Sequence, residues 1–385
     1  MIKKNIIYYT HTYFLDSCLE TIQSIKLDVD INLIIELSHD SKNSTIININ
    51  NLDILEEIVD FEQVVDQKTW KKFEKYFNGL KSIKFVVFKN NKSLSVNTIQ
   101  TGIKLWKYIN ETKAETIHFD TISNRAYMII PLLFFKTIYV TIHDSVPHKG
   151  EESVKREIII NIHKLVTKGY FFYSEFSRKQ FIEQNRFFKI KTQNLKLQPY
   201  SFITQFKVNK VNHQKYILFF GRISLYKGID ILLKAIPKVI EKYPDEKFVI
   251  AGKADTFKID NIKNKYINNV IIIEKHINIE ELSTLIQDSK FVVCPYKEAT
   301  QSGVLMTAKA MGKLVIASNV GAFPEYINNN NDGALIQNDE KSLAGEIINW
   351  LDNNKYKSLE KNVNSMYSEK NGMENNKILM NAYNN

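Results

Sequence analysis

Two cations near the middle of the chain have the spacing of an anion-binding loop. Arg222 and Lys227 lie between the apolar run "YILFFG" and an amphipathic run that begins at Gly228. An arginine offers a planar fork of donors that suits phosphate oxygens, and a lysine offers a point charge. The end of a strand followed by the start of a helix also favours an anion. We therefore expect Gly221, Arg222 and Lys227 to hold phosphate, although two solvated surface cations are the alternative.

A second segment, "YKEATQSGVLMTAKAMGKLVIASNVGAFPE", supplies an acid before a helix start. The helix is expected to begin near Ser302, so that the free N–H groups of Ser302, Gly303 and Val304 face a ligand. Gly303 lets a ligand approach the backbone closely. Glu298 cannot favour a phosphate, but a carboxylate accepts well from sugar hydroxyls. A diphosphate beside a polyhydroxyl group describes a nucleotide sugar. A solvated Glu298 and a capping serine are the alternative.

These residues need a scaffold, and the chain supplies alternating strands and helices. Strand-like runs such as "INLIIEL" and "KFVIAG" alternate with helical runs along the whole sequence. That order predicts an α/β fold with two Rossmann-like, doubly wound parallel sheets facing a cleft. The predicted domains are residues 1–205 and 215–385, joined by a polar linker at 206–214. As an alternative for the last helix, we consider that it packs back on the N-terminal domain.

Composition narrows the class of protein. The 385 residues are 44% hydrophobic and 24% charged, which is globular composition without a disorder signature. The N-terminus reads as a first strand and not as a signal peptide, and the longest apolar runs are too short to cross a membrane. Cys18 and Cys294 have no metal spacing and fit a reducing cytoplasm. We therefore expect a cytoplasmic protein, with peripheral attachment to the inner face of the cell membrane as a further possibility.

The net charge of +10 is uneven along the chain. Residues 67–92 contain eight Lys and one acid, Glu74. Within this segment Trp70, Phe73, Tyr76 and Phe77 share one face of a predicted helix. A basic face beside an aromatic face suits a helix at an anionic membrane, so Lys68–Lys92 is a candidate membrane-binding segment. A core-facing helix with solvated lysines is the alternative, and no motif for nucleic-acid binding is present.

The two segments together resemble the retaining GT-B glycosyltransferases of family 4. The first segment supplies the family's GR and KG residues and its LL-x-A run. The second supplies an acid, a helix of small residues, G-x-x-V-I-A and G-x-P-E, ending at Glu325. The resemblance is strong over 216–340 and weaker in the first half, where "VTIHDSVPH" and "YSEFSRKQF" carry it. The family's second acid is missing, because Met306 or Thr307 stands at its position.

The resemblance implies a role for each of these residues. Arg222 and Lys227 would hold the donor diphosphate, the amides at Ser302 would assist, and Glu298 would bind the transferred sugar. The loss of the second acid leaves the binding of ribose and the identity of the base open. Glu325 is predicted to be structural rather than catalytic.

In the first half, candidate residues follow predicted strands. His143 and Asp144 come after "IYVTI", and the resemblance places such a histidine near the transferred sugar, where it could donate to a hydroxyl or shuttle a proton. A hydrogen-bonded loop histidine is the alternative. His11 and Tyr13 replace the family's glycine-rich loop and are predicted to meet the acceptor, as is His148.

Two further residues in the first half are given a structural role. His118 and Asp120 follow the run "TIHF", where they form a similar but weaker case than His143 and Asp144. We predict that these two side chains support the fold.

The predicted function is a retaining, metal-independent glycosyltransferase. It would move a sugar from a UDP- or GDP-type donor to a glycan or lipid-linked glycan in surface polysaccharide or lipopolysaccharide synthesis. No metal ligands, no cofactor and no nucleic-acid partner are expected. Two rivals stay open: a non-catalytic subunit of the same fold, and a sugar-nucleotide epimerase.

Overall fold

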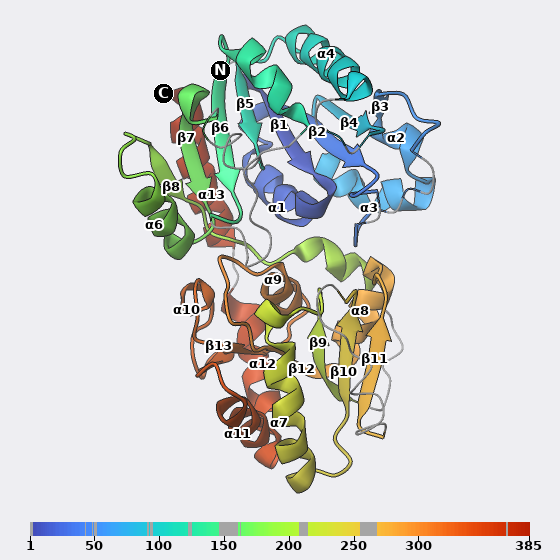
Figure 1. Ribbon diagram of the computed structural model, residues 1–385, viewed down its shortest axis with the longest axis vertical. Coiled ribbons are helices and arrows are strands. Elements are labelled where there is room, and N and C mark those ends of the chain that lie inside the picture. Colours follow the sequence, from blue (N-terminus) through green and yellow to red (C-terminus); the bar gives the residue numbers. More distant parts are fainter. Residues whose placement is uncertain are drawn as a thin grey trace. The chain divides into compact units, whose positions relative to one another are not determined.

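The computed structural model divides the chain into two compact units (Figure 1). It describes residues 3–42, 44–47, 49, 52–90, 92, 95–121, 125–145, 161, 163–207, 215–254, 268–366 and 369–385. Unit 1 contains residues 1–173, 177–196 and 370–385, and unit 2 contains residues 174–176 and 197–369.

Unit 1 is built on an eight-stranded sheet with the order β3-β4-β2-β1-β5-β6-β7-β8. All neighbouring strands run parallel except β3, which is antiparallel to β4. The strands are β1 (Lys4–His11), β2 (Val29–Ser38), β3 (Ile58–Asp60), β4 (Ser82–Phe88), β5 (Thr116–Phe119), β6 (Thr137–Ile142), β7 (Thr167–Phe172) and β8 (Thr192–Asn194). The central strands are buried, as expected for a parallel sheet covered on both faces.

Helices connect these strands. They are α1 (Leu15–Ile25), α2 (Phe61–Val64), α3 (Gln67–Phe77), α4 (Val96–Glu111), α6 (Glu175–Gln184) and α13 (Glu369–Asn384), with 3₁₀ turns η1 (Thr12–Phe14) and η2 (Ala126–Leu133). The chain's last helix, α13, belongs to unit 1. Its Asn375 exchanges two hydrogen bonds with the backbone of Lys196, at 2.7 and 2.8 Å, and its Tyr383 is buried.

Unit 2 holds a wholly parallel six-stranded sheet with the order β11-β10-β9-β12-β13-β14. Its strands are β9 (Tyr216–Phe220), β10 (Phe248–Gly252), β11 (Val270–Glu274), β12 (Ser289–Cys294), β13 (Val315–Ser318) and β14 (Gly333–Ile336). The order reverses between β9 and β12, and such a switch point is where open α/β sheets bind ligands. The predicted class, two α/β parallel-sheet domains, is confirmed.

The helices of unit 2 follow its strands in the chain and fix where the intervening loops end. They are α7 (Ile229–Lys242), α8 (Ile279–Asp288), α9 (Gly303–Ala310), α10 (Phe323–Tyr326), α11 (Glu340–Leu351) and α12 (Lys355–Met366), with η3 (Ser201–Phe206), η4 (Leu225–Lys227) and η5 (Asp352–Asn354). The helix α7 begins four residues after the start of the η4 turn, and α9 begins at Gly303, one residue after its predicted start.

The boundary between the units differs from the predicted one. The chain passes into unit 2 at Leu197, not at residue 206. The reason is the apolar side of η3, since Phe202, Ile203 and Phe206 are buried and this turn packs on α8 and α9. Most of the predicted linker, residues 208–214, lies outside the described residues.

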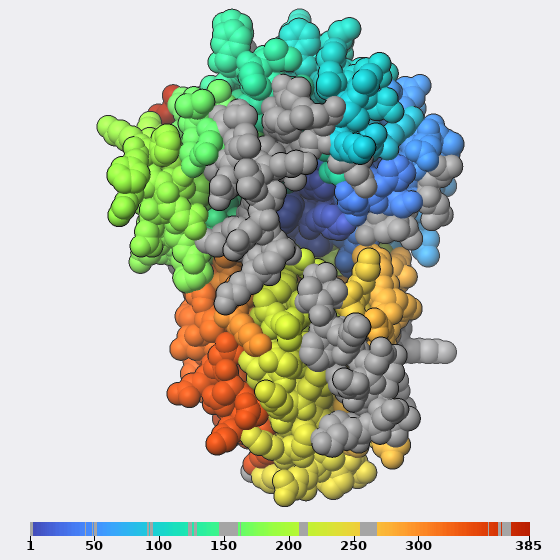
Figure 2. Space-filling view, viewed as in Figure 1, coloured from blue at the N-terminus to red at the C-terminus, as the bar shows by residue number. Residues whose placement is uncertain are grey.

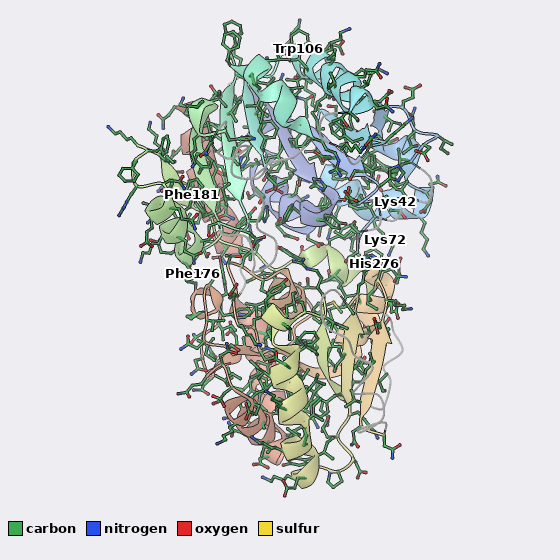
Figure 3. All side chains as sticks on the ribbon, viewed as in Figure 1. Lys42, Lys72, Trp106, Phe176, Phe181 and His276 are labelled. Carbon is green, nitrogen blue, oxygen red and sulfur yellow. The ribbon has the colours of Figure 1, made fainter. Side chains whose placement is uncertain are left out.

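The basic aromatic helix α3 turns its aromatic face into unit 1. Phe73, Tyr76 and Phe77 are buried, and Phe61 lies between the rings of this face and Phe85 of β4, with ring centroids about 5 Å apart. Figure 3 shows Lys72 on this helix. The structure therefore favours the alternative interpretation, a core-facing helix, because the aromatic face is not exposed to a membrane.

Candidate functional site

The turn after β9 brings a cation to the start of α9. Gly221 has a φ of 105°, which a residue with a side chain rarely adopts. A Cβ atom at Gly221 would lie 3.1 Å from Cγ2 of Val304 and 3.2 Å from Nζ of Lys227. The amine of Lys227 and the first turn of α9 therefore lie beside the same point of the backbone.

A tyrosine that the sequence analysis missed fixes this amine. Nζ of Lys227 donates to the hydroxyl of Tyr296 at 3.0 Å and lies 4.8 Å from the centre of its ring. Burial raises the pKa of Tyr296 well above its usual value, and a hydrogen bond with Ser302 acts in the opposite direction. The phenol therefore stays neutral and links Lys227 to Ser302.

Ser302 is the N-cap of α9. Its Oγ accepts from the backbone N–H of Leu305 at 3.2 Å, which satisfies one of the free donors of the first turn. The remaining first-turn amides and the helix dipole favour an anion, and Lys227 adds a positive charge beside them. The arrangement suits a phosphate group.

The loop between β9 and α7 is pinned against the end of β12. Gly228 has a φ of 70°, and a Cβ there would lie 1.7 Å from the carbonyl oxygen of Pro295. The backbone N–H of Lys297 donates to Tyr226 at 2.7 Å, and its amine pairs with Asp230 at 2.8 Å. These contacts leave the loop little freedom to move away from the start of α9.

Arg222 lies in the same loop and is exposed. Its guanidinium carbon is 5.5 Å from the centre of the Tyr226 ring, a distance at which a cation is attracted to the ring face. The structure thus holds both predicted phosphate-binding cations in one loop, with Tyr226 between them in the sequence.

Glu298 has the position expected of a sugar-binding acid. It lies between β12 and α9, and its side chain is half-buried. Within the described part of the chain its carboxylate has no hydrogen bond and no ion pair. An acceptor that is partly accessible in the loop before α9 can take hydroxyl donors.

The surroundings of Gly303 differ from the expectation. A Cβ at this residue would lie 3.1 Å from the ring of Tyr200, so the absent side chain leaves room for that ring. Met306 is fully buried, and Oγ1 of Thr307 donates to the carbonyl of Gly303 at 2.8 Å. Neither residue at the position of the missing acid supplies a carboxylate for the ribose.

Glu325 has a structural partner. Its two carboxylate oxygens accept from the backbone N–H groups of Glu175 and Phe176, at 2.7 and 2.8 Å. These contacts favour the structural interpretation of this acid over a catalytic one.

In unit 1, His143 is buried after the end of β6. Its Nε2 lies 3.3 Å from Oδ1 of Asp120, and its ring stacks on Phe14 with centroids 4.0 Å apart. Asp120 is itself buried and accepts from the hydroxyl of Thr10 at 2.8 Å and from that of Tyr8 at 3.3 Å. The geometry holds the His143 ring in one orientation and matches a hydrogen-bonded loop histidine as well as a sugar-binding one.

His118 lies wholly inside unit 1. Its Nδ1 is 2.5 Å from the hydroxyl of Tyr383, and its Nε2 is 2.7 Å from that of Thr141. Burial, followed by the charge of His143, lowers the pKa of His118 to about 3. This neutral histidine joins α13 to the sheet, in agreement with the structural role that we expected.

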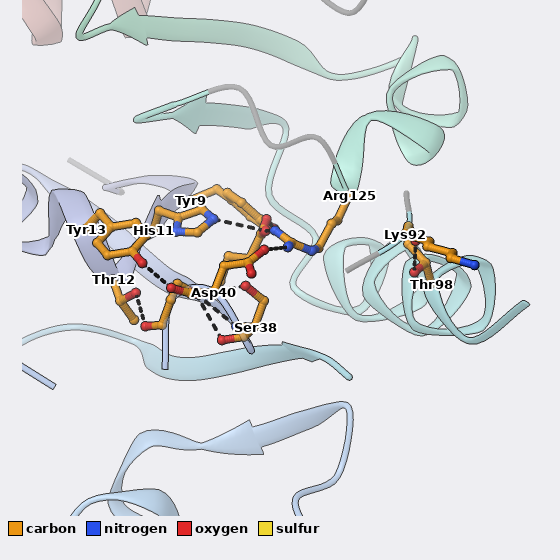
Figure 4. Close-up of polar contacts among 11 residues, drawn as sticks. Tyr9, His11, Thr12, Tyr13, Ser38, Asp40, Lys92, Thr98 and Arg125 are labelled. Carbon is orange, nitrogen blue, oxygen red and sulfur yellow. Dashed lines mark hydrogen bonds and ion pairs between the residues drawn. The ribbon is translucent and has the colours of Figure 1, made fainter. Parts of the chain in front are cut away.

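The two predicted acceptor residues, His11 and Tyr13, belong to a larger polar cluster (Figure 4). The rings of His11 and Tyr13 stack with an interplanar angle of 5° and centroids 5.9 Å apart. Nε2 of His11 lies 3.1 Å from the carboxylate of the buried Glu36, and the Tyr13 hydroxyl donates to the carbonyl of Asp40. Tyr13 is 54% exposed, so its ring is both accessible and held in place.

The sequence analysis missed the charges beneath this cluster. Glu36 accepts from the Tyr9 hydroxyl at 2.6 Å and lies 3.4 Å from Arg125, whose other nitrogen lies 2.7 Å from Asp40. Glu36 faces His11 across paired strands, in register at the carboxyl ends of β1 and β2. No local pattern connects Glu36 with Arg125, because 89 residues separate them.

The remaining predictions concern His148, Asp144, metal binding and membrane-spanning helices. His148 lies outside the described residues, and Asp144 is half-buried directly after His143. Within the described ranges, no three His, Cys, Asp or Glu side chains are placed to hold a metal ion. No helix in that part of the chain is both long and apolar enough to cross a membrane.

The C-terminal unit matches a family of known enzymes. Residues 214–353 match the family model described as glycosyl transferases group 1. An uncharacterized glycosyltransferase of Methanocaldococcus jannaschii is 31% identical over 125 residues, or 32% of each chain. Spore coat protein SA of Bacillus subtilis is 30% identical over 151 residues, 36% of this chain and 40% of that protein. The chain thus spans 32% and 40% of the lengths of these two relatives.

Similarity of structure extends over the whole chain. The Anabaena protein HepE, solved in complex with UDP and glucose, has a TM-score of 0.66 at 15% identity, with 99% of both chains covered. At this identity the likeness shows the fold. Residues 214–353 therefore match the group 1 glycosyl transferases, and the whole chain has the GT-B type of fold, two parallel-sheet α/β units.

Proposed function

We propose that the chain is a retaining glycosyltransferase that uses a nucleoside-diphosphate sugar as donor. Unit 2 binds the donor's diphosphate with Arg222, Lys227 and the first-turn amides of α9. The proposal rests on one observation: the Lys227 amine and the Val304 side chain both lie beside Gly221. A Cβ atom at Gly221 would be 3.2 Å from the amine and 3.1 Å from the Val304 side chain. The group 1 match of residues 214–353 supports it independently.

The chemistry follows from what this site can stabilise. When the sugar leaves, negative charge grows on the diphosphate, and the two cations and the α9 dipole stabilise that charge without a metal ion. The acceptor hydroxyl attacks on the face that the diphosphate leaves and passes its proton to a diphosphate oxygen, so that configuration is retained. No protein nucleophile takes part in this step.

Other residues orient the substrates. Glu298 accepts from hydroxyls of the transferred sugar, and His143, held by Asp120, contacts that sugar. His11 and Tyr13 contact the acceptor, a glycan or lipid-linked glycan of a surface polysaccharide or lipopolysaccharide pathway in the cytoplasm. The ribose is bound without a second acid, since Met306 is buried.

The test is donor binding and turnover by the purified full-length chain. UDP- and GDP-sugars are screened by thermal shift, and those that bind are then incubated without acceptor. We expect a thermal shift with one nucleotide class and slow release of sugar and nucleoside diphosphate. Arg222→Ala should lose the thermal shift, whereas Lys234→Ala on the exposed side of α7 should keep it.

Three results would contradict the proposal. Interconversion of sugar nucleotides would make the protein an epimerase. The absence of both turnover and thermal shift with every nucleotide would favour a non-catalytic subunit. An unchanged nucleoside-diphosphate affinity in Arg222→Ala would remove the donor site from this loop.

A further inference from the structure

Three large apolar side chains protrude at one edge of unit 1. Leu165 is 80% exposed, Phe187 is 85% exposed and Phe188 is 52% exposed. Leu165 lies just before β7, and the two phenylalanines lie in the turn between α6 and β8. Nζ of Lys164 lies 5.1 Å from the centre of the Phe188 ring, which brings the two segments together. We name this surface, at the amino ends of β7 and β8, the β7–β8 edge.

The fold holds these side chains outward. The opposite face of α6 is anchored by Phe181, whose ring lies 5.0 Å from Tyr170 and 5.1 Å from Phe172 (Figure 3). The turn that follows is closed by Asn185, whose carbonyl accepts from Phe188 at 2.9 Å and whose amide donates to Phe181 at 2.7 Å. The exposed rings are therefore part of an ordered turn, not of a loose chain.

Cations surround the apolar side chains. Residues 164–191 contain seven Lys or Arg and two acids, Glu175 and Glu183. Five of these cations lie in the same two segments as the apolar side chains: Lys164, Lys168, Arg186, Lys189 and Lys191. The guanidinium of Arg186 lies 5.0 Å from the centre of the Phe187 ring. Figure 2 shows this green segment at the outer rim of unit 1.

We propose that the β7–β8 edge docks unit 1 on an anionic lipid bilayer. The transfer of phenylalanine and leucine side chains from water into the membrane interface is favourable. Lysines and arginines beside them contact lipid phosphates. A nucleic acid would use the cations and the rings, but not the exposed Leu165. A second copy of the chain would bring like charges together. The charge and the apolar side chains together therefore select the bilayer.

This location differs from the one that the sequence suggested. The aromatic residues of α3 are buried, whereas those of the β7–β8 edge are exposed. The proposal does not rest on the glycosyltransferase function, because it concerns a surface of unit 1 and the donor site lies in unit 2.

The experiment is co-sedimentation of the full-length chain with vesicles. Vesicles of phosphatidylcholine alone are compared with vesicles that also contain about 30% phosphatidylglycerol, at low and high salt. We expect binding to the anionic vesicles only, and weaker binding at high salt. Since a basic residue contributes about a factor of five near an anionic surface, Lys189→Glu with Lys191→Glu should lower the partition coefficient at least tenfold.

Matched controls separate the edge from net charge and from general hydrophobicity. Lys71→Glu with Lys75→Glu makes the same charge change on α3 and should alter the partition coefficient less than about twofold. Phe187→Ser with Phe188→Ser should weaken binding about tenfold. Phe134→Ser with Phe135→Ser removes two rings that are 63% and 84% exposed elsewhere on unit 1, and should not weaken binding.

A direct readout uses Phe187→Trp. Its fluorescence should shift to the blue when anionic vesicles are added, because the indole enters the interface. The proposal is overturned if the wild type ignores anionic vesicles, if it binds neutral vesicles equally, or if the α3 variant loses as much binding as the edge variant. Binding to DNA without binding to vesicles overturns it as well. Thermal unfolding and the nucleotide-dependent thermal shift of each variant show that fold and donor binding persist.

Discussion

The two units hold their charged side chains in different ways. In unit 1, Arg125 lies against two carboxylates, those of Glu36 and Asp40, and Glu36 is fully buried. In unit 2, Lys227 donates to the neutral hydroxyl of Tyr296, and Arg222 lies exposed beside the ring of Tyr226. The first arrangement pairs its cation with carboxylates, whereas the second keeps positive charge where a ligand can reach it.

This difference has a physical consequence. A buried ion is stable only with an opposite charge or several hydrogen bonds, so removing one member of the Glu36–Arg125 pair is costly. An accessible cation keeps contact with water, so removing it should cost little stability and should act mainly on the affinity for an anion. Unit 1's cluster therefore positions His11 and Tyr13, whereas unit 2's loop leaves positive charge accessible, as the proposed donor site requires.

The largest effect is expected at Glu36. Glu36→Gln removes the buried charge that Tyr9, His11 and Arg125 share and leaves Arg125 with the exposed Asp40 as its charged partner, so it should lower the free energy of unfolding of unit 1 by about 3–5 kcal/mol. Asp40→Asn is the control, because the side chain of Asp40 is 59% exposed and its pair with Arg125 should contribute less than about 1 kcal/mol. Urea unfolding of both variants measures the two values, and equal losses would contradict the contrast between buried and exposed partners.

At Lys227 the loss should appear in binding. Lys227→Met keeps the length of the side chain but removes the charge beside α9. Because a hydrogen bond to a charged group is worth about 1.5–3 kcal/mol, the affinity for UDP or GDP should fall roughly 10- to 100-fold. Calorimetric titration measures it, with Lys234→Met as the control. A variant that unfolds earlier but binds nucleotide normally would show that Lys227 is a structural residue.

Acid should affect unit 1 before unit 2. Burial lowers the pKa values of His118 and His163 to about 3, below the usual 6.5. The unfolded chain then takes up protons first as the pH falls. The stability that these histidines support is complete above pH 6.5 and is lost progressively down to about pH 3. At pH 5 each of these two histidines should lower the free energy of unfolding by about 2 kcal/mol relative to neutral pH. In unit 2 the described histidine, His276, is exposed.

His118→Gln tests this pH dependence. The variant should lose less stability than the wild type between pH 7 and pH 5, whatever its stability at pH 7. Asp16 acts in the opposite sense, because burial and Glu20 raise its pKa to about 7 and its protonated form favours the folded state. An identical pH slope in wild type and variant would mean that His118 is not kept neutral by burial.

The fold could be predicted from the sequence wherever apolar runs were long. The strands β1, β2 and β9 are rich in apolar residues, and each was expected. Three short strands were not, β3 (Ile58–Asp60), β8 (Thr192–Asn194) and β14 (Gly333–Ile336), because three or four residues at a sheet's edge carry no periodic signal. The burial of α3 also could not be read from its own residues, since Phe61 and Phe85 decide it.

The site was predictable only where its residues are close in sequence. Arg222, Lys227 and Ser302 were found because each follows a strand or begins a helix. Tyr296, which joins Lys227 to Ser302, was missed because a tyrosine at the end of an apolar run looks like core. The Glu36–Arg125 pair depends on contacts between distant segments, which neither spacing nor composition reveals.

The smallest effect is expected at Tyr13, and it tests whether the unit 1 cluster is one network. Tyr13→Phe removes only the hydroxyl that donates to the Asp40 carbonyl and keeps the ring stacked on His11. Because this hydrogen bond is exposed, its loss should lower the free energy of unfolding by about 1 kcal/mol or less and leave nucleotide affinity unchanged. Urea unfolding beside Glu36→Gln gives the comparison. If both variants lose the same free energy of unfolding, the accessible and the buried members of the cluster contribute equally to stability. Tyr13 could then not be replaced without disturbing the buried residues that support it.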